Sequence, residues 1–156
     1  MTEILHNYGL VFLVSMVPLA ELRGAIPVGV AMGLEPWGIW LVSVLGNMIP
    51  VPFIMLFIRK IFQWMKRRSG RPARLVARLE QKAARNAELF YKYELLGLFI
   101  LVAIPLPGTG AWTGALVAAM LRLRFKMAIP VIGLGVCAAG IAVMVISYGV
   151  GAFFAL

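Results

Sequence analysis

The chain has 156 residues, of which 62% are hydrophobic and 13% are charged, and its mean hydropathy is +0.94. An ordinary soluble domain is excluded, because about half of its residues would be apolar and about a quarter charged. The formal net charge of +9 does not indicate a nucleic-acid partner, since fourteen of the fifteen cations lie in residues 59–92 and 122–126, beside apolar blocks. Basic segments of this kind are typical of cytoplasmic loops in membrane proteins. We therefore expect an integral membrane protein.

Apolar segments follow one another along the chain. A first arm from about Ile4 to Val17 leads into residues 18–27 and then into a short arm, Val28 to Leu34. Three further blocks carry no charge and have 22, 27 and 30 residues, so each exceeds the roughly 18 residues expected of a transmembrane candidate. These blocks are Trp37 to Ile58, Leu95 to Leu121 and Met127 to Leu156.

The block Leu95 to Leu121 cannot cross the membrane twice. Its two basic flanks belong on the same side, but two helical crossings of a 30 Å core need about 40 residues. The chain must turn back midway, and it carries a break where prolines remove backbone donors and glycines permit a tight turn. The break contains Pro105, Pro107, Gly108 and Gly110. A re-entrant helical hairpin entering from the cytoplasm is predicted.

The N-terminal part shows a similar break. Residues 18–27, which begin and end with Pro18 and Pro27 and contain Gly24, are expected to form an extended tip near mid-depth. The block from Trp37 then crosses inward to Arg59. Both chain termini are therefore predicted to lie outside, with the basic linker in the cytoplasm.

Weak similarity between the halves indicates an internal repeat. The matching segments are Pro18-Leu19 with Pro105-Leu106, Val30-Ala31-Met32 with Ala118-Ala119-Met120, and Leu45-Gly46 with Leu134-Gly135. The copies would have opposite orientations, as in many secondary transporters. We expect one all-α membrane domain, 1–156, in which each repeat is a re-entrant hairpin plus a transmembrane helix. The first repeat is 1–58, the basic cytoplasmic linker helix 59–94 and the second repeat 95–156.

The linker is predicted to form an amphipathic helix from about Pro72 to Tyr93, with apolar residues at three- and four-residue steps beside a basic stripe. Such a helix would lie on the inner leaflet. Its cations either only set the orientation of the chain or bind anionic lipids specifically. The stripe consists of Arg71, Arg74, Arg78, Lys82 and Arg85.

Glu21 and Arg23 are the ionisable residues of the predicted hydrocarbon region. Burying either costs about 2.5 to 3.5 kcal/mol or more, so an intramembrane pair is a candidate functional site. Residues two apart diverge on a helix but share a face in extended backbone, so in an unwound tip both could face one cavity. The alternative is an internal ion pair that only holds the tip.

The second tip is uncharged and offers the hydroxyls of Thr109 and Thr113, the Trp112 indole and freed backbone N–H groups. N–H groups at the start of a half-helix can hold an anionic group. The alternative is a plain proline kink. In the first span, Ser43 and Asn47 share a helix face and either line the pathway or bond a neighbouring helix.

Catalytic chemistry has little support. The chain has no Asp and one cysteine, Cys137, so it lacks the catalytic residues of an intramembrane protease and the ligands of a metal-dependent hydrolase. We expect no enzyme activity, no cofactor and no metal.

The segments 18–27 and 105–114 resemble the two signature segments of the family called putative small multidrug export proteins, and the resemblance covers nearly the whole chain. The arrangement is also similar to the DedA (VTT-domain) superfamily, which implies opposed re-entrant hairpins and translocation of lipids or lipid carriers, often proton-coupled. The uncharged second tip departs from the DedA pattern, which usually brings further acidic and arginine residues to its loops.

These considerations predict a proton-coupled secondary transporter or flippase of a bacterial or archaeal inner membrane, with membrane lipids, a small-molecule or lipid substrate and further copies of itself as partners. At about 5 Å and an effective dielectric near 20, a substrate cation would gain and lose roughly 3 kcal/mol from Glu21 and Arg23. An anionic or zwitterionic headgroup bound by Arg23, with Glu21 exchanging a proton, is therefore favoured. The alternatives are a DedA-like translocase of an anionic lipid or lipid-carrier phosphate, and a scaffold that does not transport. The expected site comprises Pro18, Glu21, Arg23, Gly24, Pro27, Asn47, Pro105, Pro107, Gly108, Thr109, Gly110, Trp112 and Thr113.

Overall fold

The computed structural model describes residues 2–67, 87–106 and 108–154, and every regular element in these ranges is an α-helix. The predicted all-α class is thus confirmed for the described residues. The helices are α1 (Thr2–Met16), α2 (Glu21–Ala31), α3 (Pro36–Met48), α4 (Pro50–Arg67), α6 (Ala87–Ala103), α7 (Ala111–Met120) and α8 (Phe125–Phe154).

Most of the predicted linker helix lies outside the described residues, because the description resumes at residue 87. The basic stripe of Arg71, Arg74, Arg78, Lys82 and Arg85 lies outside them too.

Two stretches are long and apolar enough to cross a membrane, Pro36–Ile61 and Phe125–Gly149. They cover most of the predicted spans Trp37 to Ile58 and Met127 to Leu156. The first stretch is not the single regular helix that the sequence predicts, because α3 ends at Met48 and α4 begins at Pro50. Proline lacks a backbone donor and is favoured at the first position of a helix, which accounts for the division.

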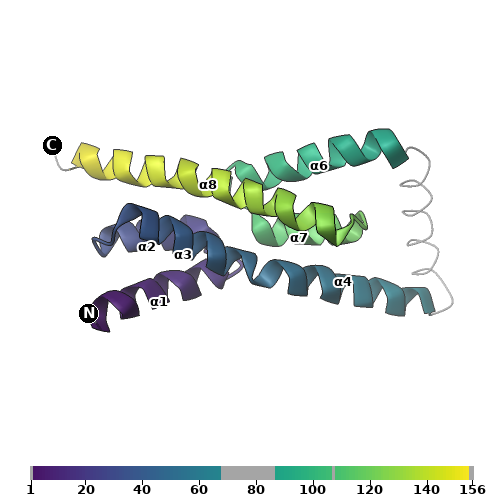
Figure 1. Cartoon of the computed structure of the whole chain (residues 1–156), viewed down its shortest axis with the longest axis horizontal. Helices are drawn as coiled ribbons and strands as arrows, with labels where there is room; N and C mark the ends of the chain where they lie inside the picture. Colours follow the sequence, from purple (N-terminus) through teal and green to yellow (C-terminus); the bar gives the residue numbers. More distant parts are fainter. Residues whose placement is uncertain (1, 68–86, 107, 155–156) are drawn as a thin grey trace.

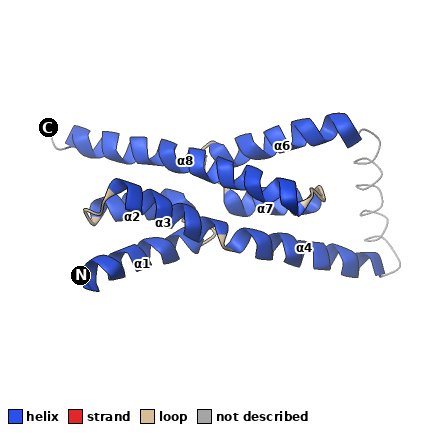
Figure 2. Ribbon diagram, in the orientation of Figure 1, coloured by secondary structure: helices blue, strands red, loops and turns tan. Residues whose placement is uncertain are grey.

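The two long stretches run side by side with shorter helices at either end (Figure 1). The beginning of α1 and the end of α8 lie at one end of the molecule, which we call the terminus end. The end of α4 and the beginning of α6 lie at the other, which we call the linker end. α1 runs from the terminus end to the centre and α2 returns toward that end (Figure 2). α6 and α7 do the same from the linker end, so both breaks fall near the centre. At about 1.5 Å per residue, the 15 residues of α1 and the 17 of α6 are too short to cross a 30 Å core.

The first break is shorter than predicted. Residues 18–27 were expected to be extended, but α2 already begins at Glu21 and continues through Pro27 to Ala31. In apolar surroundings a helix satisfies its own backbone groups, which favours helix over extended chain even at the cost of one proline. The second break lies between Ala103 and Ala111, where the sequence predicts it.

The two short arms α2 and α7 end in the same kind of turn. Gly33 (φ 69°) and Arg122 (φ 56°) both adopt the left-handed conformation that commonly ends a helix, and they lie 89 positions apart. The hydrogen bonds that close the turns join Leu34 N to Gly29 O at 3.2 Å and Leu123 N to Ala118 O at 2.9 Å. Equivalent backbone geometry therefore recurs in both halves.

Glycines bring each short arm against a neighbouring helix of its own half. A Cβ atom added at Gly29 in α2 would lie 2.9 Å from Ile39 of α3. One added at Gly114 in α7 would lie 2.5 Å from Val102 of α6. Ile39 and Val102 are both fully buried, so these contacts belong to the hydrophobic core.

Candidate functional site

The first turn of α2 meets the second break at the centre of the molecule, and Glu21 makes the closest connection. Its side chain is only 4% exposed, and its Oε1 atom accepts a hydrogen bond from the backbone N–H of Trp112 at 3.1 Å. Trp112 lies in the first turn of α7, whose free N–H groups carry the positive end of the helix dipole. Glu21 is thus the anion bound at the N-terminus of α7.

The close approach depends on Gly110, the residue before α7. A Cβ atom there would overlap the Glu21 carboxylate, and the φ of 136° is open to glycine and strained for other residues. Gly110 provides no side chain to cap α7 itself. The cap therefore comes from the other half of the chain.

Arg23 binds the opposite end of the same break. Its guanidinium group donates to the carbonyl oxygens of Leu106 and Ile104, the latter at 3.2 Å, and to Thr109 Oγ1 at 2.8 Å. These carbonyls follow the C-terminus of α6, where the negative end of the helix dipole favours a cation. The Arg23 Nε atom is buried without a hydrogen-bond partner.

The extended tip expected around Glu21 and Arg23 is not formed, because α2 begins at Glu21, whose own φ is 48°. Both side chains line one narrow space, but they bond different partners. Glu21 reaches the beginning of α7 and Arg23 the end of α6. The charged pair of the first half therefore binds both broken ends of the second hairpin.

The hydroxyls of the second tip stabilise the break itself. Thr109 Oγ1 lies 2.9 Å from the carbonyl oxygens of both Ile104 and Leu106, and Thr113 Oγ1 donates to Gly108 O at 2.9 Å. Thr109 also accepts from Arg23, so it connects the local backbone to a charged residue of the first half. That these hydroxyls face a polar cavity stays a prediction. The Trp112 indole Nε1 is buried and has no partner.

Asn47 lies beside the two charged residues. It lines a space too narrow to hold a water molecule, together with Glu21, Arg23, Gly110 and Val136. Its side chain is fully buried, and neither its oxygen nor its nitrogen has a hydrogen-bond partner.

Ser43, one turn earlier on α3, is also fully buried with an unpartnered hydroxyl. The bond to a neighbouring helix that we considered for Ser43 and Asn47 is therefore not made in this conformation.

The other predicted site residues that the structure describes lie in the two breaks or on α2. Pro18 is exposed in the first break, Pro27 is exposed on α2, and Gly24 packs near Ala20. Pro105 is half-buried in the second break. Gly108 has a φ of 84°. Pro107 lies outside the described residues.

One contact was not anticipated. Arg59, which the sequence analysis used only as a marker of topology, donates to Leu123 O, and its Cζ atom lies 4.0 Å from the centre of the Phe125 ring. It thus holds the C-terminal turn of α7 at the linker end. The available signal was an arginine at the end of an apolar span, which does not reveal its partner.

The site contains no evident metal centre. Across residues 2–67, 87–106 and 108–154, no three His, Cys, Asp or Glu side chains come together. The chemistry available at the centre is therefore hydrogen bonding, one acid and one guanidinium group.

Comparison with known proteins gives one match. The model of the family described as "Putative small multi-drug export protein" matches residues 21–142, a range that begins at Glu21 and includes the second break. No curated protein and no solved structure matches the chain.

Proposed function

Because the chain belongs to the small multi-drug export protein family, we propose that it is a proton-coupled membrane transporter or flippase whose substrate site lies where the two breaks meet. The family and the two apolar stretches indicate a membrane protein. The observation that carries the proposal is that Glu21 and Arg23 close the first half onto the broken helix of the second.

In this proposal the halves are inverted repeats with re-entrant hairpins. Three observations support it: the arms are too short to cross, the breaks lie centrally, and the turns at Gly33 and Arg122 match. Opposed hairpins that meet near mid-depth are a transporter architecture, because irregular backbone at that depth is tolerated only when buried or facing a polar cavity.

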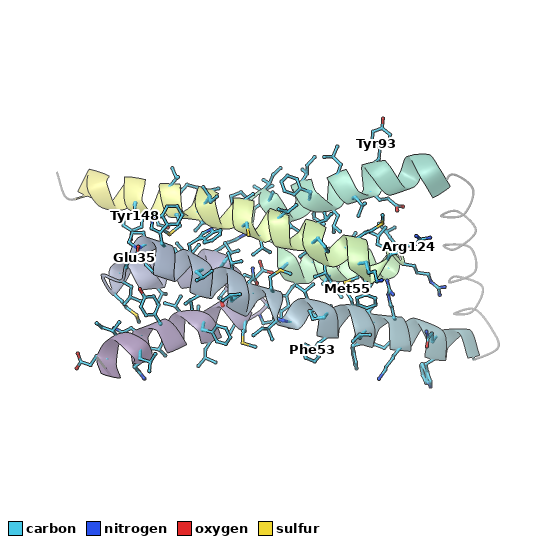
Figure 3. The ribbon with its side chains drawn as sticks, in the orientation of Figure 1. Glu35, Phe53, Met55, Tyr93, Arg124 and Tyr148 are labelled. Carbon is cyan, nitrogen blue, oxygen red and sulfur yellow. The ribbon has the colours of Figure 1, made fainter. Side chains whose placement is uncertain are left out.

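We assign the linker end to the cytoplasm. Arg124 lies at that end, whereas Glu35 and Tyr148 lie at the other (Figure 3). Cations concentrate on the cytoplasmic side of membrane proteins. The surface between the two ends carries exposed apolar side chains suited to lipid, among them Phe53 and Leu134.

A transporter must open its substrate site to one side of the membrane and then to the other, which requires the two breaks to separate. Their separation breaks the hydrogen bonds of Glu21 and Arg23. A proton on Glu21 would remove the charge that α7 holds. An anionic group could then take its place at the N–H groups of Trp112 and Ala111, with Arg23 as counter-ion. This exchange couples one proton to one anionic or zwitterionic headgroup, such as that of a lipid or lipid carrier.

The experiment is proton movement in proteoliposomes that contain a pH-sensitive dye. We expect proton flux on addition of a lipid phosphate and little on addition of a quaternary ammonium compound. Glu21→Gln and Arg23→Ala should abolish the flux. Arg124→Gln, which changes an exposed cation, should retain it.

A scaffold function is the second candidate, and it is favoured by the space around Asn47 being too narrow to hold a water molecule. If the contact between the two breaks never opened, Glu21 and Arg23 would serve only to hold the two halves together. In that case no substrate of either charge would move protons, and Glu21→Gln would change stability without changing flux.

A further inference from the structure

Helix α3 carries two buried polar side chains that have no hydrogen-bond partner. Asn47 and Ser43 are both 0% exposed, and none of their side-chain oxygen or nitrogen atoms has a hydrogen-bond partner. Polar groups buried in this way are rare in folded proteins, because burial removes hydration without replacing it. They point to a conformation in which water or another polar group reaches them.

The two side chains form a short stripe that leads away from Glu21. Asn47 lines the narrow space that contains Glu21, and Ser43 lies one helical turn closer to the terminus end. Figure 3 shows that end of α3 near Glu35. The next turn carries Ile39, which is fully buried against Gly29 of α2 and closes the stripe toward the outside of the molecule.

The equivalent positions in the second half carry apolar side chains. Residues 89 positions after Ser43 and Asn47 are Ile132 and Val136 of α8, and both are 0% exposed. Val102, also fully buried, lies against Gly114 and Gly135 on this side. A proton moving toward the linker end would meet apolar walls, whereas one moving toward the terminus end would meet an amide and a hydroxyl.

We propose that protons reach Glu21 from the terminus end, through water that bonds Ser43 and Asn47 when Ile39 moves away from Gly29. This inference rests on the proposed function. A hydronium ion in the route transfers its proton to a Glu21 carboxylate oxygen and leaves as water.

Arg23 is the charged group that acts on Glu21 among the described residues. The side chains that α3, α6, α7 and α8 present to Glu21 do not titrate. They are Asn47, Val102, Ala111, Val136 and Ala139.

The test measures access of water to four positions in oriented proteoliposomes. In a Cys137→Ala background, the single variants Ser43→Cys, Asn47→Cys, Ile132→Cys and Val136→Cys are treated with a charged, membrane-impermeant thiol reagent from either side. We expect Ser43→Cys and Asn47→Cys to react several-fold faster from the terminus side than Ile132→Cys reacts from either side. Val136→Cys, which lines the same space as Glu21, should also react from the terminus side. Equal rates at Ser43→Cys and Ile132→Cys, or faster reaction of Ser43→Cys from the linker side, would overturn the route.

The closure can be tested separately. Adding Ile39→Ala to Ser43→Cys should raise its rate of modification from the terminus side, because the side chain that seals the stripe is shortened. An unchanged rate would contradict the assignment of Ile39. Ser43→Cys exchanges a hydroxyl for a thiol, so it tests the route even if Asn47→Cys fails to fold.

Labelling needs no substrate and no flux, which separates the two proposals. If Ser43→Cys and Asn47→Cys react from the terminus side but no assay shows proton movement, the proposed transport function is overturned and the water route stands. If protons move but these variants react equally from both sides, the transport function stands and the water route is overturned.

Discussion

The carboxylate of Glu21 accepts a hydrogen bond from the backbone N–H of Trp112 at 3.1 Å, although 91 positions separate the two residues. Gly110 cannot cap α7 because it has no side chain, so the acid of the first half supplies the missing cap. Arg23 does the same for the carbonyls that follow α6. The second tip carries no charge of its own because the first tip provides both charges that its broken helix ends require.

Glu21→Ala should destabilise the protein more than Glu21→Gln. Alanine leaves the half-buried N–H of Trp112 without its acceptor, which costs about 1 to 3 kcal/mol, whereas the glutamine carbonyl can still accept. Unfolding titrations with SDS in mixed micelles measure the difference. Equal losses of stability would show that the carboxylate does not act as the cap of α7.

Arg23→Lys should lower stability by about 1 to 3 kcal/mol, because one ammonium group cannot reproduce the fork that binds Ile104, Leu106 and Thr109 together. The same titration provides the measurement. Arg124→Lys is the matched control on an exposed arginine and should shift stability by less than about 0.5 kcal/mol. If both substitutions had the same small effect, the role of the guanidinium geometry would be refuted.

Two glycines of the second break should respond differently to alanine. At Gly108, where φ is 84° and nothing lies near the added atom, Gly108→Ala should cost about 1 to 2 kcal/mol of backbone strain. Gly110→Ala adds an overlap with the Glu21 carboxylate, so its cost should be larger by about 1 to 3 kcal/mol. Combining Gly110→Ala with Glu21→Ala should recover part of the loss.

That recovery is measurable as a double-mutant cycle, since the two residues are in contact. Additive effects of Gly110→Ala and Glu21→Ala would mean that the carboxylate and the glycine do not touch in the membrane.

The sequence was sufficient to predict the helical class and the position of the second break. Length together with basic flanks expected on one side of the membrane predicts a turn between Glu94 and Arg122, and Pro105 and Gly108 mark the place. The first break was placed less well. Pro27 was interpreted as the end of an extended tip, but the apolar surroundings favour helix from Glu21 onward.

The partners of the charged residues could not be predicted. Glu21 and Arg23 stand out as charges in an apolar part of the sequence, but nothing in their spacing indicates that they bind backbone atoms about 80 to 90 positions away rather than each other. Arg59 was missed for the same reason, because its acceptor is the backbone carbonyl of Leu123, which the identity of that residue does not reveal. Contacts to backbone need the packed fold before they can be recognised.

The opposite ends of the molecule should be accessible from opposite sides of the membrane. Glu35 lies at the terminus end and Arg124 at the linker end, and both are exposed (Figure 3). In a Cys137→Ala background, an impermeant thiol reagent added outside whole cells should modify Glu35→Cys and spare Arg124→Cys until the membrane is permeabilised. Lys60→Cys should behave like Arg124→Cys, because the cations of both halves belong on the cytoplasmic side. Modification of Arg124→Cys from outside while Lys60→Cys stays protected would place the two flanks on different sides, and α6 and α7 would then have to cross rather than re-enter.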